Sequence, residues 1–257
     1  MALVDRLLHR DLSFPEHKIN LHDDYNVPYP PLNSSESSSR KSFFSLPQSS
    51  PAYTLTPRNP LSNHNPLNMA QFLRKRWRWL TLGSQYDWAT RQYPPKDKVP
   101  TQFPPDIAKL VSNLFPPVRA ESGVVLIYSP KDFMPVHRDV SELCERELCS
   151  FTLGCDGLFI IALDKDQDQC GNDDEERPQK TVVIRVRSGD MVQMAGPTRW
   201  SWHAMPKVMA GTCAEFLQNW PAVPQADLKD KDMKAYQKWK GYMTGKRINI
   251  SCRQVYD

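Results

Sequence analysis

Two histidines and one aspartate have the types and spacing that could bind a metal ion. His137 and Asp139 lie two residues apart, so on an extended strand or at its end both side chains leave the same face. His203 is a further candidate, because the other four histidines all lie at or before His64. A single buried histidine is more often structural than a ligand, so the assignment depends on this combination. Two histidines and one carboxylate leave open metal positions, as in non-heme Fe(II) sites, whereas a structural zinc site wants a fourth protein ligand and none is evident.

A second group of residues could bind an organic acid. Segment 247–253 alternates polar and apolar residues, which predicts a strand whose polar face carries Arg247, Asn249, Ser251 and Arg253. Two inward-facing arginines in a small barrel would be costly without anions, because a buried charge needs a partner. A dicarboxylate such as 2-oxoglutarate would meet both guanidinium groups. The alternative is a solvent-exposed edge strand, which would not account for the matched pair.

The elements that would position these residues form a mainly β pattern. The chain has 257 residues, and its 23 prolines outnumber its 10 glycines. Helical periodicity predicts helices over 105–115 and 228–243. The alternating or apolar runs that we expect to be strands are 122–129, 135–139, 149–154, 157–163, 181–187, 190–195, 198–206 and 246–254. Eight strands in this rhythm predict an α+β, mainly β fold: a double-stranded β-helix, or jelly roll, with flanking helices and an irregular N-terminal arm.

The arm is expected to cover residues 1–70. Residues 28–68 are rich in proline, serine and asparagine, and their Ser-Pro and Asn-Pro steps disfavour helix, so we expect a poorly ordered segment crossing the surface. Apolar residues at helical spacing within 1–12 predict a short amphipathic helix that packs on the core. Residues 71–257 would then form the folded domain.

Composition limits the partners and the compartment only loosely. The formal net charge of +4 permits a polyanionic partner without demanding one. Six cysteines without a CxxC pair or a secretory leader favour reduced thiols inside the cell. No apolar run approaches the roughly 18 residues of a membrane span. We therefore expect a soluble monomer with no membrane partner. We expect it in the nucleus, the cytoplasm or both, and the mitochondrion is a further alternative.

A basic and aromatic segment, about 74–95, could recognise a nucleotide. Aromatic rings stack on bases, and arginine or lysine side chains meet phosphates. The candidate substrate-binding residues, including one arginine near His203, are Trp77, Trp79, Tyr86, Trp88 and Arg199. The alternative is that the tryptophans belong to the core and the charges are merely solvated.

Several segments together resemble the AlkB family of Fe(II)/2-oxoglutarate-dependent dioxygenases. The matching residues are Tyr128, 137–139, 150–154, 188–190, Gly196, Arg199, His203 and 247–253. The resemblance spans about 77–255. Segment 79–88 and the long insertion before Arg247 are similar to the eukaryotic AlkB homologue 1 branch in particular, in its fungal form.

The resemblance implies a role for each matching residue. The residues that would bind iron and carry the catalysis are His137, Asp139 and His203. The residues that would bind 2-oxoglutarate are Tyr128 and Arg247 at the distal carboxylate, Arg253 at the metal-proximal carboxylate, and Asn249 of the closing motif. One position departs from the family: Leu126 stands where asparagine is common, which removes one expected hydrogen bond to the co-substrate.

The activity that the resemblance implies is oxidative demethylation of N-methylated bases in RNA or DNA, with methyladenine in tRNA or mRNA among the expected substrates. It would require Fe(II), 2-oxoglutarate and dioxygen, with ascorbate as the reductant in vitro, and would release formaldehyde and succinate. The target base would have to be single-stranded or flipped out of a duplex. Two alternatives stay open: a protein substrate such as a histone, and a non-enzymatic nucleic-acid-binding relic, for which Leu126 is the only hint.

Overall fold

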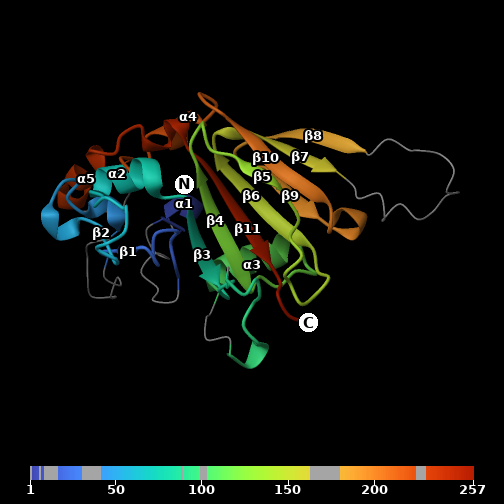
Figure 1. The fold of residues 1–257 in the computed structure, drawn as a ribbon. Helices are drawn as coiled ribbons and strands as arrows, with labels where there is room; N and C mark the ends of the chain where they lie inside the picture. The colour runs from blue at the N-terminus through green and yellow to red at the C-terminus, as the bar shows by residue number, and fades with distance from the viewer. Residues whose placement is uncertain are drawn as a thin grey trace, which may run out of the picture.

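Two antiparallel sheets stand against each other in the computed structural model, which describes residues 2–5, 7–8, 17–30, 42–87, 89–98, 103–162, 180–223 and 230–257 (Figure 1). Within these residues the larger sheet has the strand order β3-β4-β11-β6-β9, and the smaller has β5-β10-β7-β8. The larger sheet contains β3 (Trp79–Gly83), β4 (Ser122–Tyr128), β6 (Leu148–Gly154), β9 (Met191–Met194) and β11 (Arg247–Arg253). The smaller contains β5 (Met134–His137), β7 (Asp156–Ala162), β8 (Thr181–Val186) and β10 (Trp202–Met209). This arrangement is the expected jelly roll.

The helices flank the larger sheet, and Figure 1 shows α1, α2 and α5 gathered on the side of β3. The α-helices are α1 (Ala2–Asp5), α2 (Met69–Gln71), α3 (Pro105–Leu114), α4 (Glu215–Gln218) and α5 (Asp230–Gln237). The short 3-10 and π segments are η3 (Phe43–Ser45), η4 (Pro51–Tyr53), η5 (Phe72–Arg76), η6 (Lys96–Lys98), η8 (Gly196–Thr198) and η9 (Tyr242–Gly245). A separate two-stranded sheet pairs β1 (Tyr25–Asn26) with β2 (Thr56–Pro57). Among the helices described, none is both long and apolar enough to cross a membrane.

The expected strands are all present, with three informative differences in the elements around them. The predicted strand 198–206 begins only at Trp202, because residues 196–198 form a 3-10 turn. Among the described residues of the predicted helix 228–243, those from 230 to 237 are α-helical, and Gly241 takes a left-handed backbone with φ of 76° shortly after. Strand β3 is additional, and its near-continuous burial explains why no period-two alternation marked it.

Residues 42–68 differ from the surface arm that the composition predicted. Phe43 and Phe44 are fully buried, and their rings meet those of Trp77 and Trp239 edge to face at centroid distances of 5.9 and 5.5 Å. Leu55 is buried in the same core. The expectation of a poorly ordered arm is therefore wrong for this stretch, because isolated large apolar side chains anchor a segment that has little regular structure. Residues 31–41 lie outside the described ranges, and the division at residue 70 stays a prediction.

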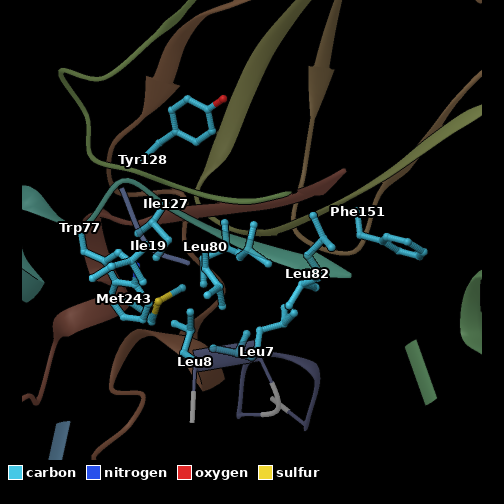
Figure 2. Packing of buried hydrophobic residues seen from close by; sticks show 14 of the residues in the cluster. Leu7, Leu8, Ile19, Trp77, Leu80, Leu82, Ile127, Tyr128, Phe151 and Met243 are labelled. Carbon is cyan, nitrogen blue, oxygen red and sulfur yellow. The ribbon is translucent and has the colours of Figure 1, made fainter. Parts of the chain in front are cut away.

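The N-terminal residues cover the outer face of the larger sheet. Leu7 and Leu8 are fully buried in the core. Figure 2 shows them beneath the side chains of Leu80 and Ile127, whereas Tyr128, the next residue on β4, points away from this cluster. Because side chains alternate along a strand, covering one face leaves the other to line the space between the sheets. The polar residues of β11 face this space.

Candidate metal and co-substrate site

The pairing of β5 with β10 brings the two histidines together. His137 and His203 are register partners across this ladder, and their ring centroids lie 4.2 Å apart. Asp139 follows two residues after the end of β5, and its Oδ2 lies 3.5 Å from His203 Nε2. One ligand atom from each of the three residues lies within 4.8 Å of the other two. The structure thus gathers the three side chains that the sequence singled out as metal ligands.

Backbone carbonyls fix which nitrogen each imidazole offers. His137 Nδ1 lies 2.9 Å from the Pro135 carbonyl oxygen, and His203 Nδ1 lies 3.1 Å from that of Ser201. A carbonyl oxygen only accepts, so each Nδ1 carries the proton and donates it. Each Nε2 then keeps its lone pair, which is the form that a metal binds.

The charge states of the group suit a cation. Burial alone would raise the pKa of Asp139, but Arg253 and the two histidines hold it well below its usual value. Burial, followed by the neighbouring His203, lowers the pKa of His137. An ionised carboxylate and a neutral imidazole at neutral pH are the forms that ligate a metal.

A cavity of about 400 Å³ opens beside this group, between the two sheets. The predicted metal ligands and the predicted co-substrate residues all line it: Tyr128, His137, Asp139, His203, Arg247, Asn249 and Arg253. Ser251 lines it as well, so the polar face of β11 points inward as the alternation predicted. The alternative of a solvent-exposed edge is wrong, since β11 lies between β4 and β6.

Arg247 lies at one end of this polar row with donors to spare. Its side chain is 1 % exposed, and Nη2 donates to Thr152 Oγ1 at 2.9 Å and Asn249 Oδ1 at 3.0 Å. Its Nε and Nη1 are buried without a hydrogen-bond partner among the described residues. Burial lowers its pKa to about 10, and burial raises the pKa of the adjacent Tyr128 to about 12. A buried cation with two unused N–H donors fits a carboxylate of a dicarboxylic co-substrate.

Arg253 lies at the other end of the row, and its guanidinium is already paired with acidic side chains of the protein. Its Nη1 lies 3.1 Å from Asp139 Oδ1 and 2.9 Å from Glu142 Oε1, and Nη2 donates to Ser251. Only its Nε is buried without a partner among the described residues. Burial would lower its pKa, but the acidic neighbours, Asp139 first, raise it well above the usual value. Arg253 therefore retains one free donor toward an outside anion.

Two neighbours of Arg247 were not identified from the sequence. Thr152 accepts a hydrogen bond from Arg247, and its alternation with Ser150 along the expected strand was the available signal. Gly157 had no signal, because its importance lies in contact across the sheets. A Cβ there would lie 2.9 Å from Arg247 Nε and 2.6 Å from Met205 Sδ. Glycine therefore leaves the room that the Arg247 side chain occupies.

Leu126 faces the cavity, as its departure from the family pattern implied. It is the register partner of Asn249 across β4 and β11, and it lines the same cavity. An asparagine at this position would stand beside the polar row, whereas leucine offers only apolar contact. Leu126 therefore offers no hydrogen bond in the part of the cavity where the sequence predicts that the co-substrate binds.

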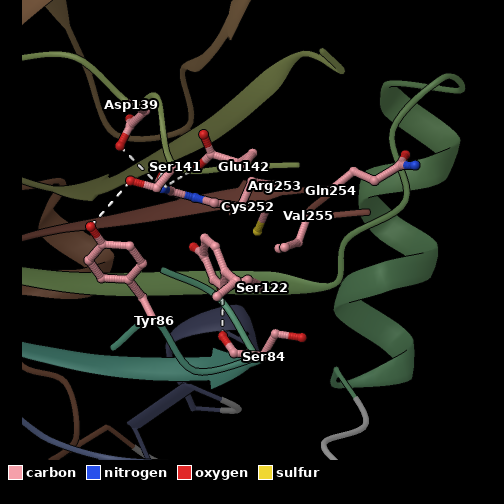
Figure 3. Close-up of polar contacts among 12 residues, drawn as sticks. Ser84, Tyr86, Ser122, Asp139, Ser141, Glu142, Cys252, Arg253, Gln254 and Val255 are labelled. Atoms are coloured by element: carbon pink, nitrogen blue, oxygen red, sulfur yellow. Dashed lines mark hydrogen bonds and ion pairs between the residues drawn. The ribbon is translucent and has the colours of Figure 1, made fainter. Parts of the chain in front are cut away.

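The candidate substrate residues fall into three groups. Tyr86 lines the cavity, and its hydroxyl lies 3.2 Å from Ser141 Oγ, two residues from Asp139 (Figure 3). Trp77 is buried in the aromatic core, so its prediction as a base-stacking residue is wrong. Trp79 is half-buried on β3 and is not among the described residues that line the cavity. Trp88 lies outside the described residues.

Arg199 does not reach the cavity either. The sequence pattern placed it on one strand face with His203, but the strand starts after it, and its side chain is 2 % exposed. Its guanidinium stacks over the Trp200 ring at 4.1 Å and pairs with Glu142. The assignment of Arg199 to the substrate pocket is therefore wrong.

Three clustered metal ligands beside a buried arginine with free donors define a metal-dependent oxygenase that takes an anionic co-substrate. The sequence pattern of the 2OG-Fe(II) oxygenase superfamily matches residues 34–253, and the chain belongs to this superfamily. Fe(II) and 2-oxoglutarate are therefore its metal and co-substrate, and the residues around the cavity fit both. The resemblance found in the sequence is confirmed.

Relatives with assigned activities cover most of the chain. An N6-methyladenosine RNA demethylase of Pyricularia oryzae is 40 % identical in an alignment of 263 positions that covers 99 % of this chain and 70 % of the relative. A second N6-methyladenosine RNA demethylase, from Cryphonectria parasitica, is 38 % identical in an alignment of 242 positions that covers 92 % of this chain and 100 % of the relative. A tRNA demethylase of Schizosaccharomyces pombe is 29 % identical in an alignment of 262 positions that covers 99 % of this chain and 74 % of the relative.

Proposed function

We propose that this dioxygenase removes methyl groups from N-methylated bases in nucleic acid, with methyladenine in RNA as the first candidate. The observation that carries the proposal is that one cavity is lined by the metal ligands, by Arg247 with its free donors and by Tyr86. The relatives named as RNA and tRNA demethylases support the substrate class.

The residues divide the chemical work between them. Fe(II), held by the two histidines and Asp139, would together with 2-oxoglutarate and dioxygen supply the oxidation of an N-methyl carbon, with succinate, carbon dioxide and formaldehyde as products and an N–H left on the base. His137 and His203 present Nε2 to the metal because their Nδ1 protons are held by carbonyls. Arg247 binds and orients a carboxylate of the co-substrate. Phe159 also lines the cavity, with its ring centroid 5.8 Å from that of His203, and supplies an apolar surface beside the metal site.

The depth of the site sets how a base would enter. His203 is 8 % exposed, so a base still stacked in a duplex could not bring its methyl group to the metal. We propose that a single-stranded or flipped-out nucleotide enters past Tyr86, which lines the cavity and whose ring would stack on the base. Ascorbate as the in vitro reductant, a monomeric state, and a location in the nucleus, cytoplasm or mitochondrion stay predictions.

Mass spectrometry of methylated nucleosides tests the proposal. The full chain is incubated with Fe(II), 2-oxoglutarate and ascorbate, separately with tRNA, mRNA and DNA. His137→Ala serves as the inactive variant, and His64→Ala, which changes an exposed histidine away from the cavity, serves as the matched control. We expect one methyl mark to fall in the wild-type and His64→Ala reactions only, with formaldehyde released in equal amount to the mark lost.

Two results would contradict the proposal, one at the substrate and one at the metal site. Succinate formation without loss of any mark in the three pools would show an active dioxygenase with another substrate, such as a protein. Loss of a mark that persists in His137→Ala would show that the metal site assigned here is not responsible.

A further inference from the structure

The metal ligand Asp139 lies outside regular secondary structure. Strand β5 ends at His137 and β6 begins at Leu148, and the residues between them form neither helix nor strand. No sheet ladder therefore fixes the aspartate in the way that the β5–β10 pairing fixes the two histidines. Other contacts must hold its carboxylate at the metal position.

Arg199 supplies one of these contacts through the backbone. Its Nη1 donates to the Asp139 carbonyl oxygen at 2.8 Å, and its Nε donates to the Arg146 carbonyl oxygen at 2.6 Å. The planar fork of one guanidinium thus ties two points of the same loop. Stacking on the Trp200 ring at 4.1 Å holds this fork in place.

Glu142 connects Arg199 to the carboxylate of Asp139. Its side chain is fully buried; Oε2 lies 3.0 Å from Arg199 Nη2, and Oε1 lies 2.9 Å from Arg253 Nη1. The same Arg253 nitrogen lies 3.1 Å from Asp139 Oδ1 (Figure 3). Asp139 is therefore held at both ends, its carbonyl by Arg199 and its carboxylate by Arg253, and Glu142 joins the two arginines.

We propose that Glu142 and Arg199 are positioning residues of the metal centre, which hold the Asp139 carboxylate at the point where it completes the ligand set. This inference rests on the metal site and does not depend on which methylated substrate the enzyme uses. The network also aims Arg253, because Glu142 fixes one of its nitrogens. Arg199 thus acts on the metal ligand through the Asp139 backbone and is not among the described residues that line the cavity.

Stability alone is a poor account of this arrangement. Taking charges out of water costs several kcal/mol each, and apolar residues of similar volume often replace a buried ion pair at no loss of stability. The network keeps two arginines and a fully buried glutamate next to a metal ligand. Contacts of this kind are known to orient metal ligands without touching the metal themselves. Their removal typically lowers metal affinity about 10- to 100-fold.

Calorimetry of metal binding to the metal-free full chain tests the proposal without any catalytic readout. Co(II) is the probe because it does not react with dioxygen as Fe(II) does. Glu142→Gln keeps the shape of the side chain and removes its charge, and we expect it to weaken Co(II) binding about 10- to 100-fold. Glu145→Gln, on the same loop but exposed, is the matched control and is expected to bind like the wild type.

A second variant makes the test independent of the first. Arg199→Lys keeps the positive charge beside Glu142 but loses the fork that also reaches the Asp139 carbonyl, so it should weaken Co(II) binding as well. If the two residues act through one network, the double variant should lose less than the two single losses added together. In succinate formation from 2-oxoglutarate, the Fe(II) concentration for half-maximal rate should rise more than the maximal rate falls.

Wild-type Co(II) affinity in Arg199→Lys, or in a folded Glu142→Gln, would overturn the proposal and leave the network a purely structural role, whatever the melting temperatures. If Glu142→Gln does not fold, Arg199→Lys decides alone. Failure of the nucleoside experiment would leave these metal affinities unchanged, so the two proposals fail separately.

Discussion

Arg247 and Arg253 occupy the same face of the same strand but have opposite surroundings. Arg247 has only a hydroxyl and an amide oxygen as partners and keeps two buried donors free among the described residues. Arg253 meets two carboxylates of the chain, Asp139 and Glu142. Burial lowers the pKa of the first, whereas the neighbouring acids raise that of the second.

The difference indicates that Arg247 and Arg253 are not equivalent binding sites for the two carboxylates of one co-substrate. No carboxylate of the described residues neutralises Arg247, so we expect a bound anion to do so. Arg253 is already compensated, and its main contacts go to a metal ligand and to the residue that we assign to positioning. We therefore expect Arg247 to supply the positive charge that binds the co-substrate, and Arg253 mainly to hold the residues at the metal end in place.

Replacing Arg253 should give the largest loss of stability. Arg253→Met leaves Asp139 and the fully buried Glu142 without their shared cation, and breaking a buried ion pair from one side costs about 3–5 kcal/mol. Urea unfolding of the metal-free chain would measure this change in the free energy of unfolding. Arg187→Met, at an exposed position, is the control. An unfolding midpoint equal to that of the control would contradict the view that Arg253, unlike Arg247, neutralises buried carboxylates of the chain.

Replacing Arg247 should reverse the pattern, with a large effect on binding and a small one on stability. Arg247→Met removes the cation that meets the co-substrate, which should weaken 2-oxoglutarate binding by about 2 kcal/mol or more, or about 30-fold. The free energy of unfolding should change less than in Arg253→Met, because only neutral oxygens lose a donor. Calorimetry with 2-oxoglutarate and Co(II), beside urea unfolding, measures both. If Arg247→Met and Arg253→Met lowered the free energy of unfolding equally, the proposed difference between the two arginines would be wrong.

A gain of function at Leu126 is the smallest expected effect. Leu126→Asn adds a polar group beside Asn249 at the Arg247 end, where the family commonly has asparagine. One added hydrogen bond contributes about 1 kcal/mol, so 2-oxoglutarate should bind about fivefold more tightly. Leu114→Asn, exposed on α3, controls for the substitution itself. Weaker binding than in the wild type would show that leucine serves the co-substrate by apolar contact instead.

The sequence predicted the metal ligands and β11 because each depends on a local rule. Alternation along 247–253 placed four polar side chains on one face, and two-residue spacing placed His137 beside Asp139. Such patterns follow from strand geometry, which any single segment carries. The fold followed in the same way from the rhythm of the strands.

What the sequence missed depends on contacts between distant segments. Nothing near Gly157 indicates that Arg247 needs its space, and nothing near Glu142 indicates that two arginines converge on it. Phe43 sits in a stretch whose composition suggests disorder, yet it is fully buried. Arg199 was misplaced because a short turn shifted the start of its strand, and period-two reasoning fails once the backbone leaves the extended form.

The position of β11 has a consequence for the order in which the enzyme becomes active during synthesis. β11 is the last strand along the chain in the described residues, yet it inserts between β4 and β6, which are made about a hundred residues earlier. A nascent chain that extends only through β10 already contains all three metal ligands but neither Arg247 nor Arg253. The three metal ligands are therefore synthesised before Arg247 and Arg253, and we expect a nascent chain that still lacks β11 to bind 2-oxoglutarate far more weakly than the folded protein.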